Sequence, residues 1–178
     1  MKRRTGKFSG KQPVVIYDRI MCLRPEEFMR QTVALAVDSV KIHNGGPFGA
    51  LVVQDNRVIA TGINLVTSSK DPTAHAEVVA IRAACQALGS FLLAGCEIYC
   101  SCEPCPMCLG AIYWARLNRC YFSATRQDAA AASFDDSFLY DELALAPEQR
   151  SIPGICVPVE ERLRPFAEWA KSANRVLY

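Results

Sequence analysis

Apolar residues recur at helical spacing over the first clearly patterned part of the chain. The stretch from Pro25 to His43 predicts an amphipathic helix, because its apolar side chains return every three or four residues. Its apolar stripe consists of Met29, Val33, Ala36, Val37 and Val40. The sequence Asn44-Gly45-Gly46-Pro47 follows and is typical of a helix end. We therefore expect this stripe to lie against the core.

Short apolar runs bounded by turn residues predict strands further along the chain. Ala50 to Gln54 and Val58 to Gly62 flank Asp55-Asn56, a dipeptide that favours a hairpin turn. Three later runs have a similar character, namely Glu97 to Cys102, Arg119 to Ala124 and the short Ile155 to Val159. The sequence thus predicts five strands, the last of them close to the C-terminus.

Helix signals alternate with these strands. Asp71-Pro72-Thr73 predicts a helix start, since Asp is a good N-cap and Pro suits the first helical position, and Gly89 predicts the end. Pro104 leads into a helix that reaches about Arg116. A terminal helix is predicted from Glu160 to Asn174, with Leu163, Phe166, Ala167 and Ala170 facing inward. This order of elements favours a three-layer α/β domain.

Length and composition favour one compact domain. The chain has 178 residues, of which 51% are apolar, enough for one good core. Nine cysteines, an odd number with several in apolar runs, favour reduced thiols and a cytoplasmic location over a disulfide framework. We expect a basic extension over residues 1–20 and a folded domain over residues 21–178. No segment approaches the length of a membrane span, so no membrane partner is expected.

The charge distribution bears on the substrate. The formal net charge of +2 arises in residues 1–11, which hold five basic residues and no acid. The rest of the chain has fifteen Lys and Arg against eighteen Asp and Glu. A protein that holds nucleic acid usually carries a basic face, because phosphate neutralisation supplies much of the affinity. We therefore expect no nucleic-acid substrate; the basic stretch itself is either a solvated terminus or a nucleic-acid-binding tail.

One constellation of residues carries chemistry. His75-Ala76-Glu77 is followed by Pro104-Cys105-Pro106-Met107-Cys108, and H-x-E followed by P-C-x-x-C is the pattern of zinc-dependent nucleobase deaminases. One imidazole and two thiolates leave the fourth position of a zinc ion open to water, as in catalytic sites. The predicted ligands of Zn²⁺ are His75, Cys105 and Cys108. Glu77 is the candidate that carries a proton from water to the ring nitrogen and the departing amine.

The cysteines also fit other kinds of site, but less well. Cys102, Cys105 and Cys108 overlap an iron–sulfur spacing, yet position 112 is Ile where that pattern needs a further Cys. A Cys-x-x-Cys pair alone suits a redox site or half of a structural zinc ribbon, and no second pair at comparable spacing follows. Cys102 is not expected to be a ligand, because Cys100 and Cys102 share one face of a strand. A silent zinc-binding scaffold would have no use for Glu77.

Two segments carry a further signal: the run from Ser101 to Arg116, which holds the second half of the zinc motif, and Phe134-Asp135-Asp136-Ser137-Phe138. Together they resemble bacterial guanine deaminases of the cytidine-deaminase fold. The resemblance covers about residues 24 to 178, and the Phe-Asp-Asp segment is its narrower mark. It implies an α/β fold, a three-layer α/β/α cytidine deaminase-like arrangement with a mixed five-stranded sheet. It also implies one zinc ion per subunit.

The resemblance further implies a set of substrate contacts. Asp136 would be a second carboxylate that recognises the guanine edge and helps the amine leave; Asp135 is the alternative, because neighbours on an extended segment face opposite ways. The remaining implied contacts are Phe48, Asn64, Ala76, Trp114 and Tyr178. Structural roles stay open for three of them: loop packing for Phe48, turn formation for Asn64 and helix packing for Trp114.

The resemblance also implies a homodimer in which the C-terminal segment crosses to the partner. Tyr178 would then cover the neighbouring site and exclude water and large substrates; the alternative is a helix packed on its own subunit. We predict zinc-dependent hydrolytic deamination of guanine to xanthine and ammonia, with a small nucleobase as the partner molecule. Guanosine, cytosine or a related amino-substituted ring are alternatives. A tRNA adenosine deaminase agrees less well with the acidic body and the Phe-Asp-Asp segment.

Overall fold

The computed structural model describes residues 25–43 and 45–177. The basic extension predicted for residues 1–20 lies outside the described residues, as does Tyr178. Within the described residues, no helix combines the length and apolar character needed to span a membrane.

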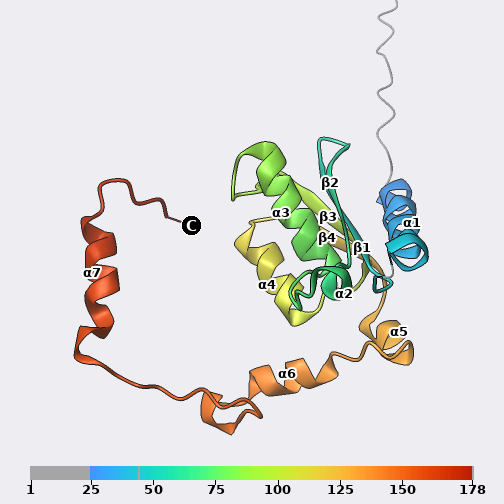
Figure 1. Cartoon of the computed structure of the whole chain (residues 1–178). Helices are drawn as coiled ribbons and strands as arrows, with labels where there is room; N and C mark the ends of the chain where they lie inside the picture. Colours follow the sequence, from blue (N-terminus) through green and yellow to red (C-terminus); the bar gives the residue numbers. More distant parts are fainter. Residues whose placement is uncertain (1–24, 44, 178) are drawn as a thin grey trace, which may run out of the picture.

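A mixed sheet of four strands forms the centre of the fold (Figure 1). The strands are β1 (Gly49–Gln54), β2 (Arg57–Ile63), β3 (Glu97–Cys102) and β4 (Arg119–Ala124), in the spatial order β2-β1-β3-β4. β1 pairs antiparallel with both β2 and β3, and β3 pairs parallel with β4. The four predicted strands up to residue 124 are confirmed. A five-stranded sheet is not found among the described residues, because Ile155–Val159 is not a strand.

The hairpin turn between β1 and β2 follows directly from its two residues. Asp55 and Asn56 have φ angles of 48° and 60°, the left-handed values that a two-residue type I′ turn needs. Asn and Asp tolerate this conformation better than other residues with a side chain. The predicted hairpin is therefore confirmed.

Helix α1 (Pro25–His43) has the predicted bounds but a different inward face. It packs on β1 and β3 through four buried residues, Phe28, Thr32, Ala36 and Ser39. Of the predicted stripe, Val33, Val37 and Val40 are exposed. The prediction failed because Thr32 and Ser39 were counted as polar although both are fully buried, and the Thr32 hydroxyl donates to the carbonyl oxygen of Phe28.

Two helices cover the opposite face of the sheet, which gives the predicted three layers (Figure 1). They are α3 (Ala76–Leu88), which packs on β2 and β1, and α4 (Pro106–Trp114), which packs against α3. Gly62 permits the close approach of α3, since a Cβ there would collide with the carbonyl oxygen of Ala76. The start of α3 is thereby pressed against the end of β2.

The predicted start of α3 at residues 71–73 is wrong. Asp71 accepts hydrogen bonds from the backbone N–H and the hydroxyl of Thr73, so its carboxylate closes a local turn instead of capping a helix. The helix begins only at Ala76, after His75 as N-cap. A short helix, α2 (Val66–Ser69), fills part of the preceding loop.

The chain after β4 runs away from the sheet (Figure 1). It forms α5 (Arg126–Ala131), α6 (Ser137–Ala144), the 3₁₀ turns η1 (Pro147–Gln149) and η2 (Glu160–Leu163), and α7 (Arg164–Lys171). The terminal helix predicted for 160–174 thus exists in shorter form. Its predicted inward side chains are all exposed, because α7 stands apart from the sheet. We call residues 152–177 the tail. Its exposed side chains include many apolar ones, among them Ile152, Ile155, Val157, Val159, Leu163, Phe166 and Trp169.

Candidate active site

Two helix N-termini carry the predicted metal ligands. His75 is the N-cap of α3, Cys105 is the N-cap of α4, and Cys108 lies in the first turn of α4. Because α3 and α4 pack against each other, these two ends converge. Unpaired N–H groups and a partial positive charge at a helix N-terminus favour the thiolate form of cysteine.

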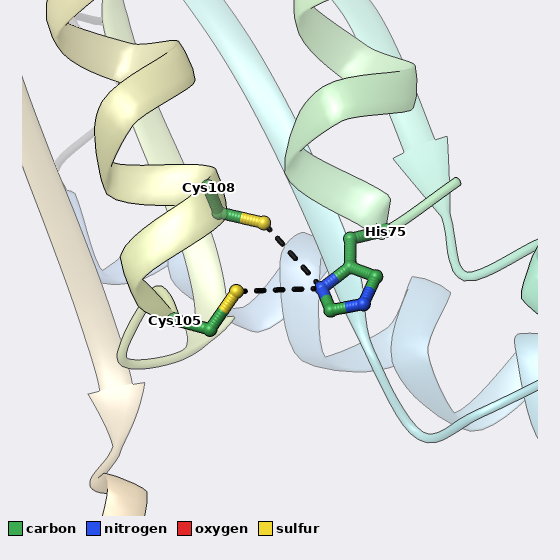
Figure 2. A group of neighbouring side chains, drawn as sticks. All are labelled: His75, Cys105 and Cys108. Atoms are coloured by element: carbon green, nitrogen blue, oxygen red, sulfur yellow. Dashed lines mark hydrogen bonds between the residues drawn. The ribbon is translucent and has the colours of Figure 1, made fainter. Parts of the chain in front are cut away.

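The three donor atoms have the spacing that a tetrahedral zinc ion requires (Figure 2). His75 Nδ1 lies 3.6 Å from the Cys105 sulfur and 3.5 Å from the Cys108 sulfur. With Zn–S bonds of about 2.3 Å and Zn–N bonds of about 2.0 Å, tetrahedral angles place sulfur and nitrogen about 3.5 Å apart. Within residues 25–43 and 45–177, no other group of His, Cys, Asp and Glu side chains converges in this way. The donor set and its geometry therefore fit zinc.

Hydrogen bonds among the ligands prepare one thiolate. Cys108 and His75 hydrogen-bond to the Cys105 sulfur and lower the pKa of Cys105 to about 4. The same contact raises the pKa of His75, and hydrogen bonding to Cys105 raises the pKa of Cys108. Cys105 is thus ionised at neutral pH, and a bound cation supplies the charge that ionises the second thiol.

Glu77 lies beside the ligands in the first turn of α3 and does not belong to the converging donor group. Its side chain is buried, at 8% exposure. Burial raises the pKa of Glu77, because a charged carboxylate is poorly solvated there. A carboxyl group with a raised pKa holds a proton more readily than an exposed one, and general acid–base catalysis needs a group that takes up a proton and returns it.

A cavity of about 330 Å³ opens over the ligands. Its volume lies in the usual range for small-molecule sites. The two halves of the zinc motif form its floor, and the walls come from the loop before β1, from α2 and from the chain after β4. The residues lining it are Gly46, Phe48, Asn64, Val66, Thr67, His75, Glu77, Cys102, Glu103, Cys105, Arg126, Ala129, Phe134, Asp135 and Asp136.

Comparison with known proteins assigns this arrangement to a family. Residues 24–124 match the cytidine and deoxycytidylate deaminase zinc-binding region. The chain belongs to this deaminase family. It is 52% identical over 153 residues to a guanine deaminase of Bacillus subtilis (strain 168), a match that covers 86% of this chain and 98% of that protein.

Solved structures of guanine deaminases share the fold of this deaminase. The X-ray structure from Bacillus subtilis has a TM-score of 0.86 at 51% identity and covers 88% of this chain and 99% of that chain. A guanine deaminase from Nitrosomonas europaea has a TM-score of 0.60 at 32% identity, covering 63% of this chain and 65% of that one. The predicted fold class and the resemblance are confirmed.

Asp135 and Asp136 differ in their surroundings in this deaminase, although both line the cavity. Asp135 is exposed and accepts the backbone N–H of Ser137, which lowers its pKa. Asp136 is half-buried, and burial, followed by the negative charge of Cys105, raises its pKa. Asp135 therefore closes a turn, while Asp136 is the carboxylate that lies near enough to Cys105 for the two charges to interact.

The structure places some predicted substrate contacts at the cavity and others elsewhere. Phe48 and Asn64 line it, and the Asn64 side-chain oxygen accepts the N–H of Val66, so its NH₂ group is the part that can donate to a ligand. Ala76 is fully buried and is not among the lining residues. Trp114 ends α4 with 62% of its surface exposed, outside this cavity.

Sequence reasoning missed several residues of the cavity wall. Thr67 and Val66 come from α2, a helix of four residues that no hydrophobic pattern indicates. Phe134 was noted only as part of a motif, yet its ring meets Phe48 edge to face at 5.1 Å. Arg126 carried no signal apart from its charge. Each of these residues reaches the site through tertiary packing.

Proposed function

We propose that this deaminase hydrolyses guanine to xanthine and ammonia. The observation that carries the proposal is the converging triad of His75, Cys105 and Cys108 beside the buried Glu77, in a cavity that Asp136 also lines. The high identity to a Bacillus subtilis guanine deaminase over most of both chains supports the same substrate. We further propose one zinc ion per subunit and a cytoplasmic location, the latter supported by the free state of every described cysteine.

The chemistry assigns one task to each residue at the floor of the cavity. A zinc ion held by His75, Cys105 and Cys108 would lower the pKa of its bound water to about 7 and so would supply a nucleophile at neutral pH. The water oxygen forms a bond to C2 of guanine, and Glu77 takes one proton from this water and gives it to the ring nitrogen. Glu77 then takes the second proton, from the new C2 hydroxyl group, and gives it to the amino group. The bond from C2 to the amino nitrogen breaks as the C2 carbonyl forms, and ammonia departs.

The wall residues suit the edge of guanine. Guanine presents N–H donors beside the O6 acceptor, so a carboxylate and an amide can read it together. Asp136 accepts from the donors, the NH₂ group of Asn64 donates to O6, and Phe48 covers the flat ring. Among the residues that line the cavity, Arg126 is the single Arg or Lys that could bind a phosphate group. The cavity is therefore poorly suited to a chain of several phosphates.

Purified, zinc-loaded protein should release ammonia from guanine and not from cytosine, cytidine or adenine when each is offered separately. Turnover of guanosine in addition would show that the site admits a ribose, and turnover of cytosine instead would contradict the proposed role of Asp136. In the same assay, Asp136→Asn should lower kcat/KM for guanine by about a hundredfold, because a buried ligand group loses its charged partner. Asp135→Asn is the matched control and should stay within about threefold of the parent, since Asp135 serves a surface turn.

We also propose a homodimer in which the tail of one copy covers the site of the other. Among the residues that the structure describes, no strand pairs with the outer edge of β4, and Phe122 on this strand is exposed. The nearby outer face of α1 exposes Val33 and Val37, and both valines line a second cavity of about 570 Å³. An unpaired edge and an apolar face of this kind call for a covering element.

The tail has the complementary character. Ile155 to Val159 alternate as a strand would, and α7 presents Phe166 and Trp169 on one exposed face. In a single copy these side chains stay in water at a cost of about 25 cal/mol per Å² of apolar surface. A second copy offers the β4 edge that would turn this segment into the fifth strand expected from the sequence. In this arrangement Tyr178 would cover the active site of the other copy.

Replacing Phe166 and Trp169 together by Glu should produce a monomer in light scattering and reduce guanine turnover at least about tenfold, because buried anchors dominate interfaces. Glu168→Ala on the opposite face of α7 is the control; it loses an exposed ion pair with Lys171 and should remain dimeric. Mixing the double variant with an inactive Glu77→Gln copy should restore part of the activity, since the intact tail then covers the intact site. A dimeric double variant, or no restoration, would contradict the exchange.

A further inference from the structure

Two ring contacts hold the segment that carries Asp136. On the N-terminal side, the Phe134 ring meets the Phe48 ring at 5.1 Å with an interplanar angle of 87°. On the C-terminal side, the guanidinium of Arg126 lies 4.7 Å from the ring centre of Tyr140 on α6. Asp136 itself is the N-cap of α6. One ring contact on each side therefore holds the segment that carries the Asp136 carboxylate.

Arg126 is fixed to the body of the protein close to the metal ligands. Its backbone N–H donates to the Glu103 carboxylate at 3.2 Å, and the Glu103 N–H donates to the carbonyl oxygen of Ala124 at 2.9 Å. Glu103 stands two residues before Cys105 in the chain. A capping box between Thr125 and Asp128 also fixes the first turn of α5, which begins at Arg126. The backbone of Arg126 is thus held in place relative to the zinc ligands.

The contact between Arg126 and the Tyr140 ring links α6 to this fixed part of the protein. A guanidinium within about 6 Å of an aromatic ring centre is attracted to the face of the ring. Within the described part of the chain, helix α6 has no extensive packing against the sheet or against α1, α3 and α4. The ring contact therefore limits how far the start of α6, and Asp136 with it, can swing away from the cavity.

We propose that Arg126 is a positioning residue that acts through the Tyr140 ring to hold Asp136 at the guanine edge. The proposal rests on the role given to Asp136 above. Arg126 also lines the same cavity as Asp136. Its charge lowers the pKa of Asp136, against the effects of burial, Cys105 and Asp135, so it favours the carboxylate that accepts from the purine.

The decisive pair of variants is Tyr140→Leu and Tyr140→Phe. Leu removes the aromatic face, and we expect kcat/KM for guanine to fall by about ten- to a hundredfold, the loss that follows from a displacement of about 1 Å in a catalytic group. Phe keeps the ring and should restore kcat/KM to within about threefold of the parent. The loss should include a raised KM with unchanged zinc content, whereas simple loss of folded protein would lower the apparent kcat and leave KM unchanged.

Arg126→Gln should reproduce the Tyr140→Leu loss, because it removes the cation from the same contact. Arg57→Gln is the matched control: it removes one positive charge at the hairpin end of β2, the end opposite to the strand terminus that leads to Asn64. It should leave KM unchanged. Equal losses in both variants would mean that net charge matters and the ring contact does not, which would overturn the proposal.

Combination with Asp136→Asn separates this proposal from the role of Asp136. In the Asp136→Asn background, Tyr140→Leu should cause no further loss, because residues that act as a unit are not additive. If Asp136→Asn alone is harmless, the proposed role of Asp136 is wrong. If Asp136→Asn is harmful and Tyr140→Leu is harmless or adds its full loss, Asp136 keeps its role and the Arg126–Tyr140 contact does not position it.

Discussion

Replacement of Glu77 by Gln is expected to lower kcat for guanine by about 10²- to 10⁴-fold, the contribution of a positioned acid–base group. The amide of Gln has nearly the size of the carboxyl group but can neither take up the proton from water nor pass it to the amine. Because Glu77 is not one of the converging metal donors, zinc content should stay at the parent value. Ammonia release, metal analysis and thermal unfolding of the same preparation measure the three quantities.

A surface glutamate provides the control for this experiment. Glu26 lies exposed in the first turn of α1, and Glu26→Gln should leave turnover and zinc content unchanged. A Glu77→Gln protein with normal turnover would rule out the proton transfer described above. A protein that loses zinc together with activity would instead make Glu77 a determinant of metal binding.

Replacement of Cys108 by Ala is expected to abolish both zinc binding and turnover. Cys108 is fully buried and its sulfur is one of three donors, so two ligands remain where a catalytic zinc site needs three. The thermal midpoint should also fall, since a metal present at a thousand times its Kd stabilises the native state by about 4 kcal/mol. Removal of zinc from the parent with a chelator should produce a similar fall, reversed when zinc is added.

Cys102→Ala separates the alternative metal sites. Cys102 donates its S–H to the carbonyl oxygen of Thr125 at 3.4 Å and is absent from the converging donor group. The variant should therefore bind as much zinc as the parent. Loss of zinc on its removal would favour a site built from Cys102, Cys105 and Cys108, the spacing that overlaps an iron–sulfur pattern.

Elements with a strong local cause could be predicted from the sequence. The bounds of α1, β3 and β4 agree with the predicted ranges, because apolar runs and proline or glycine boundaries act within a few residues of the chain. The type of turn at Asp55-Asn56 is equally local. By contrast, the predicted start of α3 at Asp71 is wrong. The Asp71 carboxylate could either cap a helix or bind Thr73, and in the structure it accepts hydrogen bonds from Thr73.

Which face of α1 is buried, and whether Ile155–Val159 forms a strand, depend on contacts with elements distant in the sequence. Thr32 and Ser39 are buried because the β1–β3 surface faces them, and their polarity hid this from the hydrophobic pattern. Ile155–Val159 has strand character but lacks a partner strand among the described residues. A strand forms only where another edge supplies its hydrogen bonds.

The sequence by itself predicted the candidate reaction centre of this protein: the proposed zinc ligands His75, Cys105 and Cys108, which converge in the structure, and the proposed acid Glu77. Residue type and spacing suffice there, because each half of the motif sits in one helix start and the chemistry needs those donors. Only the tertiary structure decided which side chains line the cavity. It separated the environments of Asp135 and Asp136, brought Arg126 to the cavity and left Trp114 outside, since such proximity arises from packing between elements far apart in the chain.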